Sequence, residues 1–161
     1  MTNTLRTAVL LAALPLGTAC DGNGDEDNAD SAAAADDSSS ERVCEGETRD
    51  DFAIGLTRDG ATVAVSIADA MPADPIRGDN GWVLMITQDS AAMDDVGIKI
   101  KPWMPDHGHG TPVEAVVTPR GDGEYMLEPL NLFMPGLWEV TFELTLADGT
   151  TDEVMFSACV Q

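Results

Sequence analysis

Short segments that alternate apolar and polar residues dominate the second part of the sequence, and they constrain the fold more than any other feature. In residues 96–101 the apolar Val96, Ile98 and Ile100 alternate with a glycine and two lysines, and in residues 136–146 an apolar residue recurs at every second position. Successive side chains of a strand point to opposite faces, so this period indicates strands with one buried face. Glycine, proline, aspartate and asparagine separate the segments, as turns require. The pattern predicts strands at 52–57, 61–67, 81–88, 96–101, 112–119, 124–130, 136–146 and 152–160.

This arrangement favours an all-β fold. No segment has a convincing helical period, and the glycines of residues 120–123 fit a hairpin turn better than a nucleotide-binding loop. Seven or eight short strands within about 115 residues are typical of an immunoglobulin-like antiparallel β-sandwich. A small β-barrel is the alternative.

The first 19 residues are predicted to be a signal peptide. Arg6 precedes an apolar run of about a dozen residues, which is the length of a signal-peptide core and too short to span a membrane. The small residues 17–19 lead to Cys20, and the stretch resembles the lipobox of bacterial lipoproteins, in which this cysteine is acylated. Leu16 lies one position too far from the cysteine for the usual pattern. Cleavage after Ala19 without lipidation is therefore the alternative.

Residues 20–43 are predicted to form a disordered acidic tether behind a lipidated Cys20. Residues 21–41 contain eight acidic residues, no basic residue and no aliphatic residue larger than alanine. Such a segment cannot bury enough apolar surface to offset its ordering entropy. A folded domain at 44–161 would then be held clear of a membrane, lipid-anchored on the periplasmic side of a bacterial envelope. The net charge of −21 excludes nucleic acid as a partner, because binding to phosphates needs a basic surface.

The two remaining cysteines, Cys44 and Cys159, open and nearly close the predicted domain. An even pair in an exported protein is typical of a disulfide. The competing interpretation is that the thiols bind a metal, but neither cysteine belongs to a CxxC pair. A disulfide is therefore expected.

Both histidines of the chain lie in one turn, within residues 103–110. In an extended chain, His107 and His109 would point to the same side and could bind one ion. Met104 adds a thioether from the same turn, and Met134 could add another from a Pro/Gly turn at the same end of a sandwich. Thioether and imidazole favour copper. Zinc is the alternative, with Asp106 as a ligand.

Several short elements, in order, resemble the YtkA-like domain family, which is related in pattern to FixH-like proteins associated with oxidase assembly. The family has a MPxMxHG turn, a G-x-Y strand and an M-x-G-x-W-x-V strand entry. The matching positions, within about residues 60–157, are Met104, Pro105, His109 and Gly110; Gly123 and Tyr125; Met134, Gly136, Trp138 and Val140; and, in an upstream G-x-N entry, Gly78 and Asn80. The resemblance implies an immunoglobulin-like fold in the bacterial envelope and associates such turns with copper handling. His107 stands where the family often has a second methionine, which would shift the site toward Cu(II).

The sequence therefore supports two functions. The first is an envelope lipoprotein that binds copper through Met104, His107, His109 and Met134, for copper handling or oxidase assembly, with a copper-receiving envelope protein as partner. The second is a structural or interaction module without a metal. An enzyme is not expected, because both histidines lie in one turn and no nucleophile-elbow signature accompanies the serines.

Overall fold

The computed structural model describes residues 43–161, and within them the chain forms ten strands. Seven strands are six residues or longer, and β1, β4 and β6 are short. The strands are β1 (Thr57–Asp59), β2 (Ala64–Met71), β3 (Gly78–Gln88), β4 (Ala91–Ala92), β5 (Gly97–Met104), β6 (His109–Gly110), β7 (Val116–Gly121), β8 (Glu124–Leu132), β9 (Gly136–Thr145) and β10 (Thr151–Val160).

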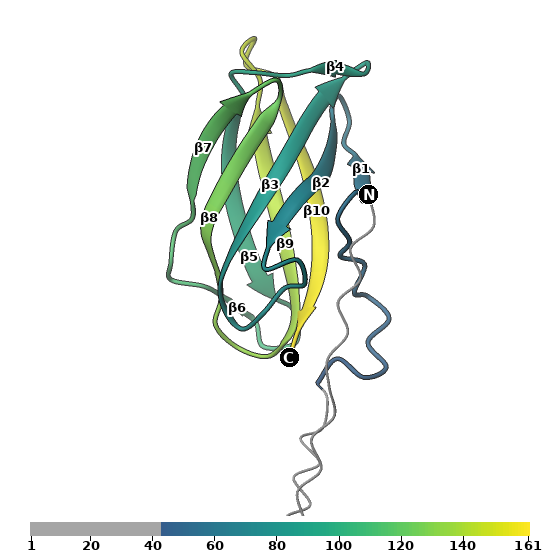
Figure 1. The fold of residues 1–161 in the computed structure, drawn as a ribbon, viewed down its shortest axis with the longest axis vertical. Coiled ribbons are helices and arrows are strands. Elements are labelled where there is room, and N and C mark those ends of the chain that lie inside the picture. The colour runs from purple at the N-terminus through teal and green to yellow at the C-terminus, as the bar shows by residue number, and fades with distance from the viewer. Residues whose placement is uncertain (1–42) are drawn as a thin grey trace, which may run out of the picture. The chain divides into compact units, whose positions relative to one another are not determined.

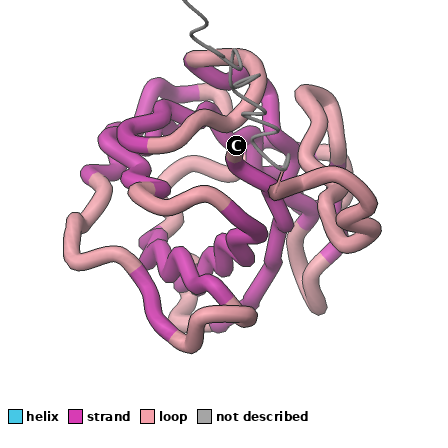
Figure 2. The backbone as a smooth tube through the Cα atoms, turned by 90° about the horizontal axis from the view of Figure 1, so that it is seen from below, coloured by secondary structure: helices cyan, strands magenta, loops and turns pink. Residues whose placement is uncertain are grey.

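The strands form two sheets that pack face to face (Figure 1). One sheet has the order β1-β2-β3-β8-β7, with β4 paired to β3, and the other has the order β10-β9-β5-β6. Every pairing is antiparallel. Figure 2 looks along the strands from the end at which the chain finishes, where several connecting loops gather. The predicted all-β antiparallel sandwich is confirmed.

The core lies between the two sheets and follows from the period-two patterns. Trp82, Leu84 and Ile86 of β3 have no exposed surface, and neither have Val140 and Phe142 of β9. The rings of Trp82 and Phe142 meet edge to face across the sandwich, with centroids 6.4 Å apart. Burial of one such side chain contributes about 1.5–3 kcal/mol, so the alternating faces of β3 and β9 supply much of the stability.

Each predicted strand has an observed counterpart, but several boundaries differ. The strand expected at 61–67 is shifted to Ala64–Met71, β3 begins three residues earlier than expected, and β5 ends three residues later. The strand expected at 52–57 is wrong for most of its length, because β1 begins only at Thr57. Gly55 has a φ of 89°, and the amide of Leu56 donates to the carbonyl of Ala53, so this stretch is a turn. The strand expected at 112–119 begins later, at Val116, because the preceding residues cross from one sheet to the other.

The predicted signal peptide (1–19), the lipidation of Cys20 and all but the last residue of the tether lie outside the described residues. Among residues 43–161, no helix is long and apolar enough to cross a membrane.

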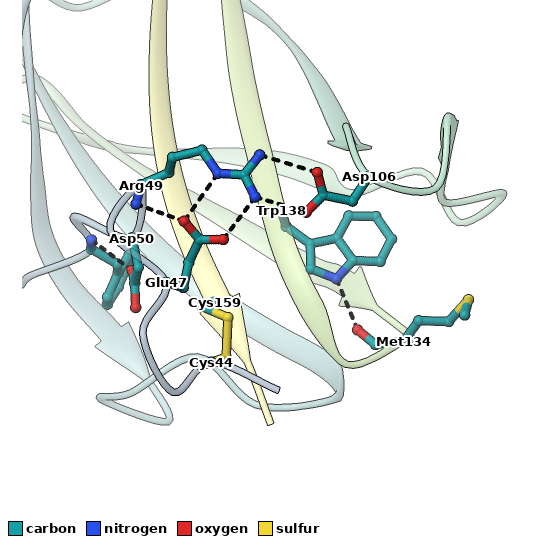
Figure 3. The surroundings of a disulfide bond; sticks show 9 residues. Cys44, Glu47, Arg49, Asp50, Asp106, Met134, Trp138 and Cys159 are labelled. Carbon is teal, nitrogen blue, oxygen red and sulfur yellow. Dashed lines mark hydrogen bonds and ion pairs between the residues drawn. A yellow bond between two sulfur atoms is a disulfide. The ribbon is translucent and has the colours of Figure 1, made fainter. Parts of the chain in front are cut away.

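The predicted disulfide joins Cys44 to Cys159, with Cα atoms 5.7 Å apart. It attaches the segment that precedes β1 to the end of β10. The same segment is also hydrogen-bonded to β10 through the amide of Asp51 and the carbonyl of Ser157, 3.2 Å apart. The N-terminal segment, residues 44–56, is therefore fixed at the end of the sandwich where Asp106 lies (Figure 3).

Candidate metal site

The two histidines lie on a tight hairpin between β5 and β6. Met104 pairs with His109, and the four residues 105–108 form the loop. The carbonyl of Met104 accepts hydrogen bonds from the amides of Gly108 at 2.8 Å and His107 at 3.2 Å. Gly108 closes the loop with a φ of 69°, a conformation that favours glycine. This glycine explains why the turn is compact enough to bring the histidines together.

The imidazoles of His107 and His109 are neighbours, with ring centroids 5.7 Å apart and planes inclined by 68°. Metal–imidazole bonds are about 2 Å long and a ring nitrogen lies about 1 Å from its ring centre, so two rings on one ion have centres up to about 6 Å apart. The observed separation falls within that limit. His107 is exposed and His109 is half-buried, so both rings can be reached from solvent. The separation of the rings therefore allows a shared ion, and binding of one metal by both imidazoles stays a prediction.

His109 contacts two aromatic rings, one from the loop between β8 and β9 and one from β9. It stacks on Phe133, with centroids 5.6 Å apart and 26° between planes, and meets Trp138 edge to face at 6.4 Å. Its Nδ1 lies 3.2 Å from the carbonyl oxygen of Gly110. A neutral ring that donates there leaves its Nε2 lone pair free to bind a metal. The surroundings thus favour one orientation and one tautomer for this histidine.

Met104 is fully buried at the end of β5. Residues paired across an antiparallel ladder have side chains on the same face, so Met104 and His109 lie side by side on the inner face of their sheet. The methyl group of Met104 fills the space beside Gly136, where an added Cβ would come within 2.8 Å of it. A bond from Met104 to a metal at His109 would therefore form from the core side of the histidine.

Met134 lies in the loop between β8 and β9 and is half-buried against the core. Its carbonyl accepts a hydrogen bond of 2.9 Å from the indole nitrogen of Trp138. Figure 3 shows its side chain extending away from that indole. The adjacent Phe133 stacks on His109, so the loop with the second methionine meets the histidine hairpin at the same end of the sandwich.

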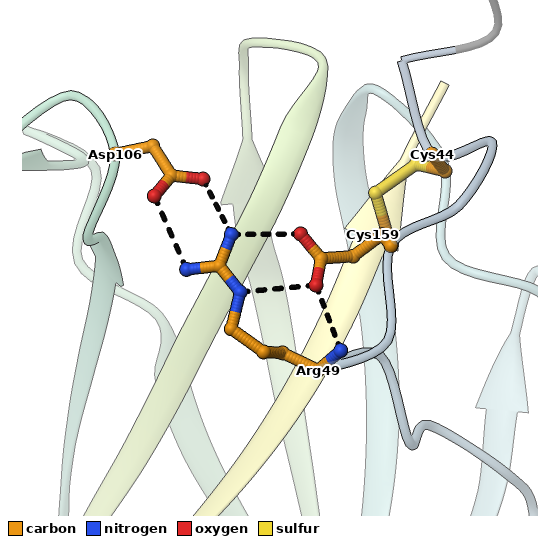
Figure 4. A network of polar contacts seen from close by, with 5 residues as sticks. Cys44, Arg49, Asp106 and Cys159 are labelled. Carbon is orange, nitrogen blue, oxygen red and sulfur yellow. Dashed lines mark hydrogen bonds and ion pairs between the residues drawn. A yellow bond between two sulfur atoms is a disulfide. The ribbon is translucent and has the colours of Figure 1, made fainter.

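Asp106 belongs to the loop of the histidine hairpin and contacts the segment that precedes β1. Its two carboxylate oxygens accept hydrogen bonds from Arg49, at 3.1 Å and 2.7 Å (Figure 4). These bonds hold the pKa of Asp106 below its usual value. Among residues 43–161, no group of three or more His, Cys, Asp or Glu side chains is arranged to hold a metal ion. Besides the histidines, the sequence gives the sulfurs of Met104 and Met134 as ligand candidates, and these stay predictions.

Sequence reasoning missed two residues of this site. Phe133 stands next to Met134 in the same turn, and an aromatic residue beside a candidate ligand was the available signal. Arg49 has no such signal, because it is 57 positions away from Asp106 in the sequence.

The structure thus defines a small antiparallel β-sandwich domain with a His-x-His hairpin and two methionines at one end. The chain belongs to the YtkA-like family, which matches residues 56–143 and so covers β1 to β8, most of β9, the histidine hairpin and the turn with Met134, but not β10. No curated protein matches the chain. Among solved structures, it is similar to PcoC, a methionine-rich copper resistance protein from Escherichia coli, at 14% sequence identity and a TM-score of 0.41, over 60% of this chain and 98% of that one.

Proposed function

We propose that this protein binds copper in the bacterial envelope, as cargo held at the histidine hairpin, and serves copper handling or oxidase assembly. The observation that carries the proposal is the pair of imidazoles, 5.7 Å apart between ring centroids, on one compact turn. The role is one of binding and transfer, and no catalytic turnover is proposed.

The donor set supports copper over other first-row metals. Imidazole binds both oxidation states of copper, and thioethers select Cu(I). His107 and His109 would supply the imidazoles, while Met104 would supply a thioether from the end of β5 and Met134 one from the loop between β8 and β9. Copper bound by neutral ligands at a half-exposed site can also be exchanged, as delivery to another protein requires.

Export and lipid anchoring at Cys20 complete the proposal. They place the domain beside membrane-bound acceptors of copper, with the acidic segment as a spacer. A copper-receiving envelope protein is the partner that such an arrangement would serve.

The test is a competition for Cu(I) between the chain from residue 21 onward and a chromophoric Cu(I) chelator. This form lacks Cys20, so no free thiol competes as a ligand. Ascorbate serves as the reductant, because thiol reductants would attack the Cys44–Cys159 bond. We expect one Cu(I) per chain, and a loss of affinity of roughly 100-fold in the variant His107→Ala/His109→Ala. If the unaltered chain withdraws no copper from the chelator, the proposal fails and the interaction module becomes the better hypothesis.

Two conservative variants separate the sulfur ligands from core packing. Met134→Leu and Met104→Leu remove the thioether but keep a side chain of similar volume, which cores tolerate well. Each is expected to weaken Cu(I) binding by roughly tenfold while leaving Cu(II) binding through the imidazoles nearly unchanged. Equal Cu(I) affinities of both variants and the unaltered chain would remove the methionines from the ligand set.

A further inference from the structure

The carboxylate of Asp106 adjoins His107 and would be a natural oxygen ligand for a metal held by the histidines. In the structure it is engaged elsewhere. Arg49 donates from Nη1 to Oδ1 at 3.1 Å and from Nη2 to Oδ2 at 2.7 Å, so both oxygens face one guanidinium. Bidentate pairs of this kind are stronger and more directional than ion pairs with a single hydrogen bond.

Arg49 is itself fixed in this orientation by Glu47. The side chain of Glu47 accepts from Nε of Arg49 at 3.0 Å, from Nη2 at 2.7 Å and from the backbone amide of Arg49 at 2.7 Å. Figure 3 shows the guanidinium of Arg49 lying between the carboxylates of Glu47 and Asp106. These bonds hold the pKa of Glu47 at about 2, so its carboxylate remains charged at neutral pH. An isolated exposed ion pair has little effect, but this one belongs to a network with near-ideal geometry.

The segment that carries Arg49 is in turn covalently attached to the sandwich. The Cys44–Cys159 disulfide ties it to the end of β10, close to the hairpin (Figure 3). The disulfide restrains the backbone near Arg49. The ion pair with Asp106 therefore forms from a restrained backbone position and not between two freely moving segments.

We propose that Arg49 determines the metal specificity of the site by withholding the Asp106 carboxylate from the ion. This inference rests on the proposed copper-binding function and deepens it. Carboxylate oxygen suits zinc and harder cations, whereas imidazole and thioether suit copper. With Asp106 engaged by Arg49, only neutral nitrogen and sulfur donors remain at the hairpin. Zinc then loses an oxygen ligand that it would use, whereas Cu(I), which favours nitrogen and sulfur ligands, does not.

The test compares Zn(II) and Cu(I) affinities in four forms of the chain from residue 21 onward: unaltered, Arg49→Gln, Asp106→Asn and the double variant. Chromophoric chelators for each metal provide the readout. In Arg49→Gln, Asp106 becomes free, so Zn(II) affinity is expected to rise by roughly tenfold or more, and Cu(I) affinity to stay within about twofold. Asp106→Asn alone is expected to change neither, because its carboxylate is already engaged. The double variant is expected to lose the gain in zinc affinity.

Arg58→Gln is the matched control for net charge. Arg58 also forms an ion pair with an aspartate, Asp51, but on β1 and the segment before it. Its removal lowers the positive charge by the same amount, so a general attraction of cations would appear in both variants. The proposal is overturned if Arg49→Gln leaves the ratio of zinc to copper affinity unchanged, if Arg58→Gln reproduces the gain, or if the gain survives Asp106→Asn. Failure of the unaltered chain to bind Cu(I) would instead refute the copper function itself. That measurement does not depend on any of the variants, so the two failures can be told apart.

Discussion

The imidazole of His109 lies against the ring of Phe133, with centroids 5.6 Å apart and an angle of 26° between the planes. The stack joins the β5–β6 hairpin to the loop between β8 and β9. Trp138 supports both rings, because it meets Phe133 edge to face at 5.7 Å and His109 at 6.4 Å. Of the two proposed imidazole ligands, His109 is therefore already oriented in the absence of a metal, whereas His107 lies on the exposed turn.

The first prediction is that Phe133→Ala weakens Cu(I) binding by roughly tenfold, because supporting contacts of a ligand typically have effects of this size. Phe133→Tyr keeps the stacked ring and is expected to bind like the unaltered chain. Competition with a chromophoric chelator measures both. Phe133 is only partly buried, so the unfolding midpoint of the alanine variant serves as a check that the fold is retained. Equal affinities of the alanine and tyrosine variants would show that the stack has no role in binding.

The second prediction concerns Gly136, at the start of β9. It has a φ of 126°, and an added Cβ would meet the methyl group of Met104 at 2.8 Å. Gly136→Ala therefore combines backbone strain with a contact in the core, and we expect a loss of about 2–4 kcal/mol in the free energy of unfolding. Urea denaturation measures it.

Gly149→Ala is the control for this prediction. Gly149 also has a positive φ, of 86°, but nothing lies within 4 Å of the added Cβ. This substitution should cost only the strain, about 1–2 kcal/mol. If Gly136→Ala loses no more free energy of unfolding than Gly149→Ala, the Met104 side chain can move aside at little cost. Its packing against Gly136 would then not fix its position.

The strands of the core were predictable because their signal is local. Trp82, Leu84 and Ile86 alternate with less buried or outward-facing residues, and all three are fully buried. The same period placed β5, β8, β9 and β10 nearly correctly. The segment 52–57 also contains apolar residues, but Gly55 at a positive φ makes a turn there, and one glycine outweighs the pattern.

The candidate site was predictable only in part, because only some of its residues are close together in the sequence. The sequence places His107, His109 and Met104 on one turn, and the structure brings the two imidazoles together there. The Arg49–Asp106 pair could not be inferred, because it depends on how the N-terminal segment is attached to the sandwich. The order of strands across the two sheets decides such contacts, and a single sequence gives no register between distant strands.

The third prediction concerns Asp152, at the start of β10, which accepts hydrogen bonds from the amides of Ala61, Thr62 and Val63, between 2.7 Å and 3.0 Å, and from the Thr62 hydroxyl. Asp152→Asn replaces one acceptor oxygen with an amide group that faces these donors. We expect a loss of about 2–3 kcal/mol in the free energy of unfolding, since bonds to a charged acceptor are lost and donors are left unsatisfied. Urea denaturation at neutral pH measures the difference.

The same residue makes stability depend on pH. Burial alone would raise the pKa of Asp152, but the backbone amides of Ala61, Thr62 and Val63 and the Thr62 hydroxyl outweigh it, so the pKa lies below its ordinary value. The contribution is therefore complete above the pKa of the unfolded carboxyl, near 4, and is lost progressively as the pH falls below it. Asp152→Asn should show a smaller loss of stability between about pH 5 and pH 2. Parallel curves for the two proteins would assign the acid sensitivity to other carboxylates.

The last prediction is that the Cys44–Cys159 disulfide stabilises the whole sandwich. It closes a loop with a sequence separation of 115, and a loop of this length restricts the unfolded chain strongly. Chain-entropy estimates give about 4–5 kcal/mol, and measured values are often lower. We therefore expect Cys44→Ser/Cys159→Ser to lower the free energy of unfolding by about 2–5 kcal/mol, measured by urea denaturation without reductant. A thiol reductant should bring the unaltered chain to the same midpoint and leave the double variant unchanged. A midpoint that does not respond to reductant in either protein would mean that the hydrogen bonds between the N-terminal segment and β10 hold the segment without the covalent link.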